Sequence, residues 1–100
     1  MTASVVRTYH VTCRSCPHQV EGEMLDGRVF YFRARHNHWT IGIGATPADA
    51  VEASCRCSTA AAEGDDPRGR ITYGDAANEA RAIIEACLAV VCEASTQAAS

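Results

Sequence analysis

Hydrophobic and polar residues alternate through two consecutive stretches in the middle of the chain, residues 28–36 and 38–44. Aromatic and β-branched residues that recur with a period of two are typical of half-buried strands, so we predict two paired strands. Because side chains alternate between the faces of a strand, one face should carry Phe30, Phe32 and Ala34, and the other Tyr31, Arg33 and Arg35. We expect helices to cover the phenylalanine face and the opposite face to be partly wet and basic.

Two segments that precede this pair also have strand character. Residues 5–12 are a first strand candidate, and residues 19–25 alternate Val20, Gly22 and Met24 with two glutamates. Asp26-Gly27 then separates two alternating runs, which is a strong hairpin signal because both residues tolerate positive φ. We therefore interpret residues 19–25 as a strand, with a helix as the open alternative, and predict a meander of three or four antiparallel strands.

The remaining periodic segments predict two helices. Thr46-Pro-Ala-Asp49 begins the first, because Thr46 can accept from unpaired amides, proline suits the first helical position and Asp49 suits the positive helix end. The second helix should extend from about residue 76 to 94, with Asp75 as its N-cap. Its apolar stripe consists of Ala80, Ile83, Ile84, Cys87, Leu88 and Val91. The alanine-rich back of this helix permits close approach of a second helix, which leaves open a homodimer.

These elements predict one α+β domain over residues 1–94, an antiparallel β-meander of three to four strands packed on a short helix and a long C-terminal helix. Residues 58–70 lack periodicity and contain several acidic residues, so we predict a mobile loop there. Residues 95–100 are expected to be a disordered tail. The chain of 100 residues is long enough for a single modest core.

Composition narrows the class of protein. A net charge of −3 argues against general attraction to nucleic acid, and the first residues lack the charged and apolar regions of a signal peptide. No apolar run approaches the roughly 20 residues that a transmembrane helix needs. We therefore expect a cytoplasmic protein without a membrane partner. Its six cysteines should be reduced or metal-bound, and not a framework of disulfides.

Cysteines supply the first candidate site. Cys13 and Cys16 have a spacing at which two thiolates on a tight turn can grip one zinc ion. A tetrahedral site needs two further ligands, for which the candidates are Cys55 and Cys57, or alternatively His36 and His38, with His10 and His18 nearer in sequence. Without a metal the same pair is either two thiols in a turn or a redox dithiol, and these alternatives stay open.

A basic strip is the second candidate site. No acidic residue occurs between Gly27 and Ala48, and the candidate binding surface there consists of Arg28, Tyr31, Arg33, Arg35 and Trp39. Arginines beside aromatic residues on an open sheet face can contact nucleic acid or an acidic protein partner. A solvated sheet face is the third interpretation. Whether Trp39 is exposed or lies in the core stays open.

Catalytic motifs are missing from the sequence. The serines and threonines have no nucleophile-elbow motif around them, and there is no HExxH motif, phosphate-binding loop or dinucleotide fingerprint. We therefore predict no catalytic residue and no enzymatic activity.

Two parts of the chain resemble heavy-metal-associated domains. Residues 11–21, which contain Cys13 and Cys16, resemble the metal-binding loop of that family, and residues 46–53 are similar to its second helix. The resemblance implies a helix directly after Cys16 and a copper(I) or similar soft ion held by the two cysteines.

Residues 16–22 and 26–35 together resemble small uncharacterised proteins encoded by phages of actinobacteria. That resemblance implies an accessory role, with a host factor as the partner. The strands followed by a capped short helix are also similar to HicB-like antitoxins.

The sequence as a whole favours a small non-enzymatic binding or accessory module of phage type that acts by protein–protein contact, with a structural zinc as an option. A soft-metal carrier that uses Cys13 and Cys16 is the first alternative. A nucleic-acid-binding or HicB-like antitoxin module is the second.

Overall fold

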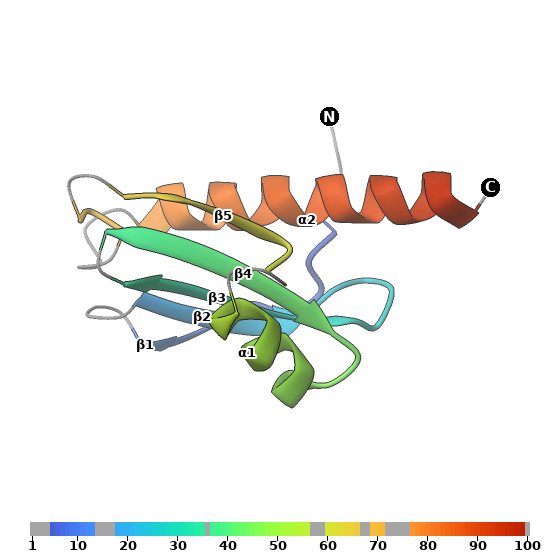
Figure 1. The fold of residues 1–100 in the computed structure, drawn as a ribbon, viewed down its shortest axis with the longest axis horizontal. Helices are drawn as coiled ribbons and strands as arrows, with labels where there is room; N and C mark the ends of the chain where they lie inside the picture. Colours follow the sequence, from blue (N-terminus) through green and yellow to red (C-terminus); the bar gives the residue numbers. More distant parts are fainter. Residues whose placement is uncertain are drawn as a thin grey trace.

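The computed structural model describes residues 5–13, 18–35, 37–56, 60–66, 69–71 and 77–99, with the backbone alone for 93–99. Five strands form one antiparallel sheet, and two helices pack against it (Figure 1). In chain order the elements are β1 His10–Cys13, β2 His18–Glu23, β3 Val29–Arg35, β4 His38–Gly44, α1 Pro47–Cys55, β5 Ala62–Asp65 and α2 Ala77–Ala99. The predicted α+β meander is confirmed.

Strand β2 settles how residues 19–25 fold. The segment from His18 to Glu23 pairs with β3 in antiparallel register, and Val20 lies opposite Phe32. This register places every second residue of β2 on the phenylalanine face, where burial of Val20 stabilises the strand. The strand prediction is therefore confirmed, and residues 18–23 do not form the helix that the heavy-metal-associated resemblance implies.

The β2–β3 connection is a hairpin at the predicted position with a different loop. The Met24 amide donates to the Arg28 carbonyl over 2.7 Å, so three residues lie in the loop. Gly27 has a φ of 92°, whereas Asp26 is not among the described residues with positive φ. Asp26 instead accepts the Arg28 amide with Oδ1 at 3.0 Å, so only the glycine supplies the left-handed conformation.

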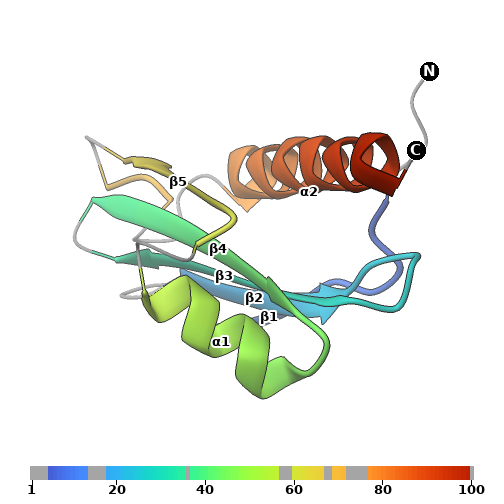
Figure 2. The same ribbon diagram turned by 45° about the vertical axis from the view of Figure 1, so that its right-hand side comes forward.

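The two helices cover opposite faces of the sheet (Figure 2). We expected both on the phenylalanine face, but only α2 lies there, and α1 covers the face that carries Tyr31. The reason is glycine at position 42, where a Cβ would overlap the Ala50 carbonyl and the Ser54 amide. The α1 backbone can therefore approach β4 closely. The alternation of apolar and polar residues along the strands does not show this approach.

The main core lies between the sheet and α2. The predicted stripe of α2 is confirmed at its centre, because Ala80, Ile84 and Leu88 are fully buried. The residues that the sheet side contributes to this core are Val20, Met24, Phe30, Phe32, Ala34 and Ile41. The helix continues to Ala99 and does not end near residue 94, while the predicted N-cap Asp75 lies outside the described residues.

Strand β5 lies within the segment that we predicted to be a loop. Ala62–Asp65 pairs with His38–Ile41 of β4, and Gly64 sits directly against the indole ring of Trp39. A side chain at position 64 would overlap that ring, so a residue that weakens strand propensity is the one that fits. Residues 62–65 form a strand because they pair with β4 and pack on Trp39, although their sequence has no hydrophobic pattern.

The start of α1 agrees with the prediction. Thr46 has an extended backbone and accepts the Asp49 amide at 3.2 Å, and Pro47 occupies the first turn. Asp49 adds a negative charge at the positive end of the helix dipole. Within the described part of the chain, neither helix has the combination of length and apolarity that would cross a membrane.

Candidate functional site

Helix α1 covers only part of its face of the sheet. It packs on β4 and β3, where the hydroxyls of Thr40 and Ser54 are 2.9 Å apart and both residues are buried. On the same face of β1 and β2, His10 is exposed and Gln19 and Glu21 are half-buried. Beside α1, this face of β1 and β2 is not covered by either of the described helices (Figure 1) and is an accessible part of the sheet.

A hollow of about 210 Å³ opens in this region. Its lining comes from β1 and the residues before it, from β2, and from the first residues of β3 and α1. It consists of Thr8, His10, Glu21, Gly22, Glu23, Val29 and Pro47. Two of these side chains are carboxylates and none is a lysine or arginine. Among the described residues, Glu21 and Glu23 make no ion pair.

The hollow borders a break in the first strand. Val6 bridges to Met24, and the amides of Arg7 and Thr8 both donate to the Glu23 carbonyl, at 2.8 and 3.2 Å. Regular pairing resumes only at His10, opposite Glu21. The predicted strand 5–12 is therefore two pieces joined at a bend, and β1 itself is limited to His10–Cys13.

Gly22 makes this bend compatible with a tightly packed sheet. A Cβ at position 22 would overlap the Thr8 carbonyl and touch the Phe30 ring. Thr8 also accepts the Glu23 amide with its hydroxyl at 2.9 Å, which holds the bend against β2. This packing places Thr8 and His10 next to the two glutamates.

Strand β1 forms one edge of the sheet, and β5 forms the other. His10, Val11 and Thr12 are exposed, and β1 contains no Asp, Glu, Lys, Arg or proline. The opposite edge differs, since β5 carries Glu63 and Asp65, which contact His38 at 3.4 and 3.5 Å. Natural edge strands are commonly protected from further pairing by charges, proline, short length or bulges. β1 has no charge and no proline, but it is only four residues long and its register shifts between Val11 and Cys13. We call β1 together with the residues that line the hollow the β1 surface.

The structure brings two of the predicted zinc ligands to the α1 face. Cys13 ends β1 in the row that contains Gln19 and Arg33, and Cys55 ends α1 with its Sγ 3.8 Å from Nη1 of Arg33. Burial raises the pKa of Tyr31, Arg33 opposes this shift, and Cys55, Glu21 and Cys13 add to it. Both cysteines therefore lie in the surroundings of Tyr31.

The other predicted ligands do not join them among the described residues. Cys16, Cys57 and His36 lie outside the described part of the chain. His38 contacts the two carboxylates of β5, at the edge of the sheet opposite β1. Where the chain is described, no group of three or more histidine, cysteine or acidic side chains is placed to hold a metal ion.

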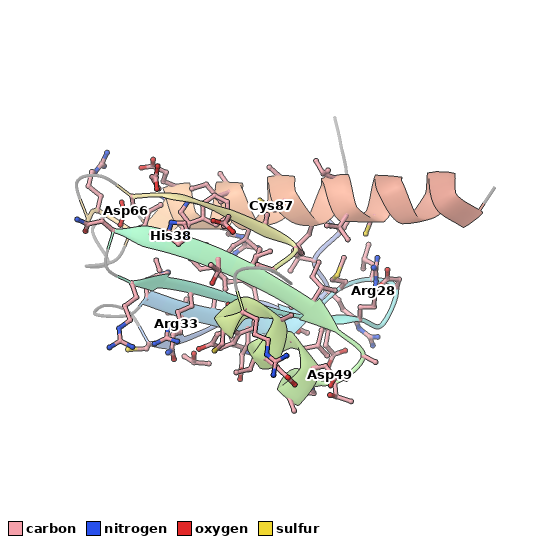
Figure 3. All side chains as sticks on the ribbon, in the orientation of Figure 1. Arg28, Arg33, His38, Asp49, Asp66 and Cys87 are labelled. Atoms are coloured by element: carbon pink, nitrogen blue, oxygen red, sulfur yellow. The ribbon has the colours of Figure 1, made fainter. Side chains whose placement is uncertain are left out.

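The predicted basic strip does not form one surface. Tyr31 is only 8% exposed because α1 covers it, and Trp39 lies on the α2 face, with its ring centroid 6.0 Å from that of Phe32. Arg28 is at the opposite end of the sheet from Arg33 (Figure 3), where it pairs with Asp26 at 2.7 Å. Of the residues of the strip that lie on β3 and β4, only Arg33 and Arg35 share both a face and an end of the sheet. Trp39 is packed against the core.

Sequence reasoning missed the hollow although its signal was present. Glu21 and Glu23 alternate with the residues that face α2, which predicts two carboxylates on one face of a strand. The bend at Arg7 and the position of Pro47 are tertiary features, and they turn this face into a concave site.

Comparisons with known proteins provide no assignment. The chain matches no protein-family model, no curated protein gave a significant match to its sequence, and no solved structure gave a significant match to its fold.

Proposed function

We propose that this protein is a small non-enzymatic binding module that contacts a protein partner through the β1 surface. The observation that carries the proposal is the combination of an exposed edge strand without charged residues or proline and a hollow beside it, on the part of the sheet that α1 does not cover. Exposed edges of this kind template pairing with a further strand.

The charge of this surface favours a protein over a nucleic acid. Its ionised groups are the carboxylates of Glu21 and Glu23, which repel phosphate, and the whole chain carries a net charge of −3. The aromatic residues that would stack on bases, Tyr31 and Trp39, are buried or packed on the opposite face. The resemblance to small actinobacteriophage proteins supports an accessory role, with a host protein as the partner.

A substitution at Val11 tests the proposal. Val11 is 45% exposed on β1, and Val90 is 65% exposed on α2, so the two valines differ mainly in location. We expect a partner captured from the cells that express the gene to be retained by wild type and by Val90→Lys, and lost by Val11→Lys. Circular dichroism and thermal unfolding would confirm that both variants fold. Equal capture by the two variants, or a partner lost only from Val90→Lys, would refute a role for β1.

Metal binding at the α1 face is a second candidate function. It is favoured by the position of Cys13 and Cys55, which reach the surroundings of Tyr31 from two different elements, with Cys16 and Cys57 following closely in sequence. A zinc ion there would join the end of α1 to β1, and copper(I) is the alternative that the heavy-metal-associated resemblance implies.

Elemental analysis of the purified protein tests this second candidate. We expect one equivalent of bound metal in wild type and in a Cys87→Ser control, and none in a Cys13→Ser, Cys55→Ser double variant. Loss of the metal should also lower the melting temperature, since a structural ion contributes to folding. A protein without metal after purification and after reconstitution with zinc or copper(I) would eliminate this function.

A further inference from the structure

We infer that the occupant of the β1 surface is an extended segment of the partner in which basic and apolar residues alternate. This inference rests on the proposed contact function and specifies the chemistry of the partner. It follows from three properties of the described residues: an open edge, the register across the first two strands, and two carboxylates without ion pairs.

The open edge determines the conformation of the segment. On its outer side β1 is bordered by no strand from the described part of the chain, and its residues are exposed from His10 to Thr12. A strand that adds to this edge makes main-chain hydrogen bonds irrespective of its sequence. The partner segment is therefore extended, with side chains that alternate between the two faces of the sheet.

The register across β1 and β2 determines what each face of the segment meets. His10 lies beside Glu21, and Glu21 beside Tyr31, so this row points to the face with the hollow. Val11 lies beside Val20, and Val20 beside Phe32, so the next row belongs to the apolar face. A residue added beside His10 would point towards the hollow, and one added beside Val11 would extend the apolar row.

The carboxylates determine the charge of the segment. Glu21 and Glu23 line the hollow together with His10, and no lysine or arginine lines it. Within the described residues, neither glutamate is neutralised by an ion pair. A lysine or arginine on the added strand could reach these carboxylates, whereas an acidic side chain at the same position would be repelled. The other row places Val11, which is 45% exposed, beside an apolar residue of the partner.

Peptide titrations test the inference directly. The probes are a short peptide of alternating lysine and valine, a peptide of the same composition with the lysines and valines in separate blocks, and an alternating glutamate–valine peptide. We expect the alternating lysine peptide to bind about tenfold more tightly than either control, by fluorescence anisotropy at low ionic strength, where charge pairs are least screened. N-methylation of its backbone amides should abolish binding, because the methylated chain cannot pair with β1.

Variants of the protein locate the binding. A Glu21→Gln, Glu23→Gln double variant should lose most of the preference for lysine over glutamate. A Glu63→Gln, Asp65→Gln control removes two carboxylates from the opposite edge and should bind as wild type does. Equal affinity for the block peptide, equal affinity for the glutamate peptide, or an unchanged preference in the Glu21, Glu23 variant would overturn the inference.

The outcomes separate this inference from the proposed function. If Val11→Lys loses the natural partner while no peptide preference exists, the contact function stands and the chemistry assigned to the partner is wrong. If wild type is a dimer by analytical ultracentrifugation and Val11→Lys is a monomer, a second copy occupies the edge, and the inference of a basic partner segment fails.

Discussion

The hydroxyl groups of Thr40 and Ser54 lie 2.9 Å apart between β4 and α1, on the face of the sheet opposite α2. Both residues are buried, and each hydroxyl satisfies the other where water has little access. This pair, with Gly42 beneath Ala50, holds α1 over β3 and β4. The position of α1 in turn decides which part of the face remains accessible to a partner.

Replacement of Ser54 by alanine should destabilise the protein. The Thr40 hydroxyl would stay buried without its partner, which costs about 1–2 kcal/mol of unfolding free energy. Urea denaturation followed by circular dichroism measures the change. A Thr40→Val, Ser54→Ala double variant removes both polar groups and should lose less stability than the sum of the single changes. Additive losses would show that the two hydroxyls do not depend on each other.

A side chain at position 64 should displace β5 from the tryptophan. A Cβ at Gly64 would overlap the indole ring of Trp39, so Gly64→Ala should cost about 1–3 kcal/mol and change the environment of the ring. Trp39 is the only tryptophan in the chain, so intrinsic fluorescence reports this change directly. The matched control is Ala61→Ser, an exposed position next to the same strand. Unchanged emission in Gly64→Ala would contradict the packing of β5 on Trp39.

The Asp26–Arg28 pair should make a small, pH-dependent contribution to stability. Hydrogen bonds from the Arg28 side chain and amide lower the pKa of Asp26, so the folded state favours the charged carboxylate. A lowered folded-state pKa stabilises the protein above the unfolded value of about 3.9, and the contribution is lost as the pH falls through the folded-state pKa. Because the pair is exposed to solvent, we expect less than about 1 kcal/mol.

Comparison of wild type with Asp26→Asn measures this contribution. The difference in unfolding free energy should be constant from pH 5 to 7. It should shrink below about pH 4, where Asp26 of the unfolded chain begins to bind a proton that the folded carboxylate still resists. The difference should also fall at high salt, because the pair lies at the surface. A difference that grows as the pH falls would contradict the direction of the pKa shift.

The described cysteines should differ in reactivity. Burial raises the pKa of the Cys87 thiol on α2, which lowers its thiolate fraction at neutral pH, whereas Cys55 is exposed at the end of α1. Iodoacetamide should therefore modify Cys55 before Cys87 in the folded protein, since the thiolate is the reactive form and access limits its rate. Peptide mapping by mass spectrometry resolves the two sites. Equal rates under native conditions that become no faster in denaturant would contradict the burial of Cys87.

The predictable parts of the fold were those in which the pattern of a segment agrees with its tertiary environment. Phe30 and Phe32 alternate with Tyr31 and Arg33, and the two sets lie on opposite faces as expected. Ile84 and Leu88 lie on the predicted stripe of α2. The Thr46 cap also formed as predicted, because its hydrogen bond to Asp49 depends only on neighbours in sequence.

The candidate site was less predictable because it depends on which elements approach each other. The sequence placed Cys13, Cys55 and Arg33 among the candidates, and the structure brings these three to one face through pairing of β1, β2 and β3 and the position of α1. Tyr31 was expected to be exposed and is covered. Tyr31 is buried because α1 covers it, and the alternation of residues along β3 does not predict where that helix packs.

The sequence alone therefore determined the period, the faces and the caps of the main elements, because these depend on contacts within a few residues. Tertiary structure decided that α1 and α2 lie on opposite faces, that residues 62–65 pair with β4, and that a hollow opens between β1, β2 and Pro47. Each of these features requires a close approach at a glycine, where a missing side chain leaves room. Backbone approaches Gly22 and Gly42, and the indole ring of Trp39 approaches Gly64. A glycine in a sequence shows that such an approach is permitted, and only the folded chain shows which partner makes it.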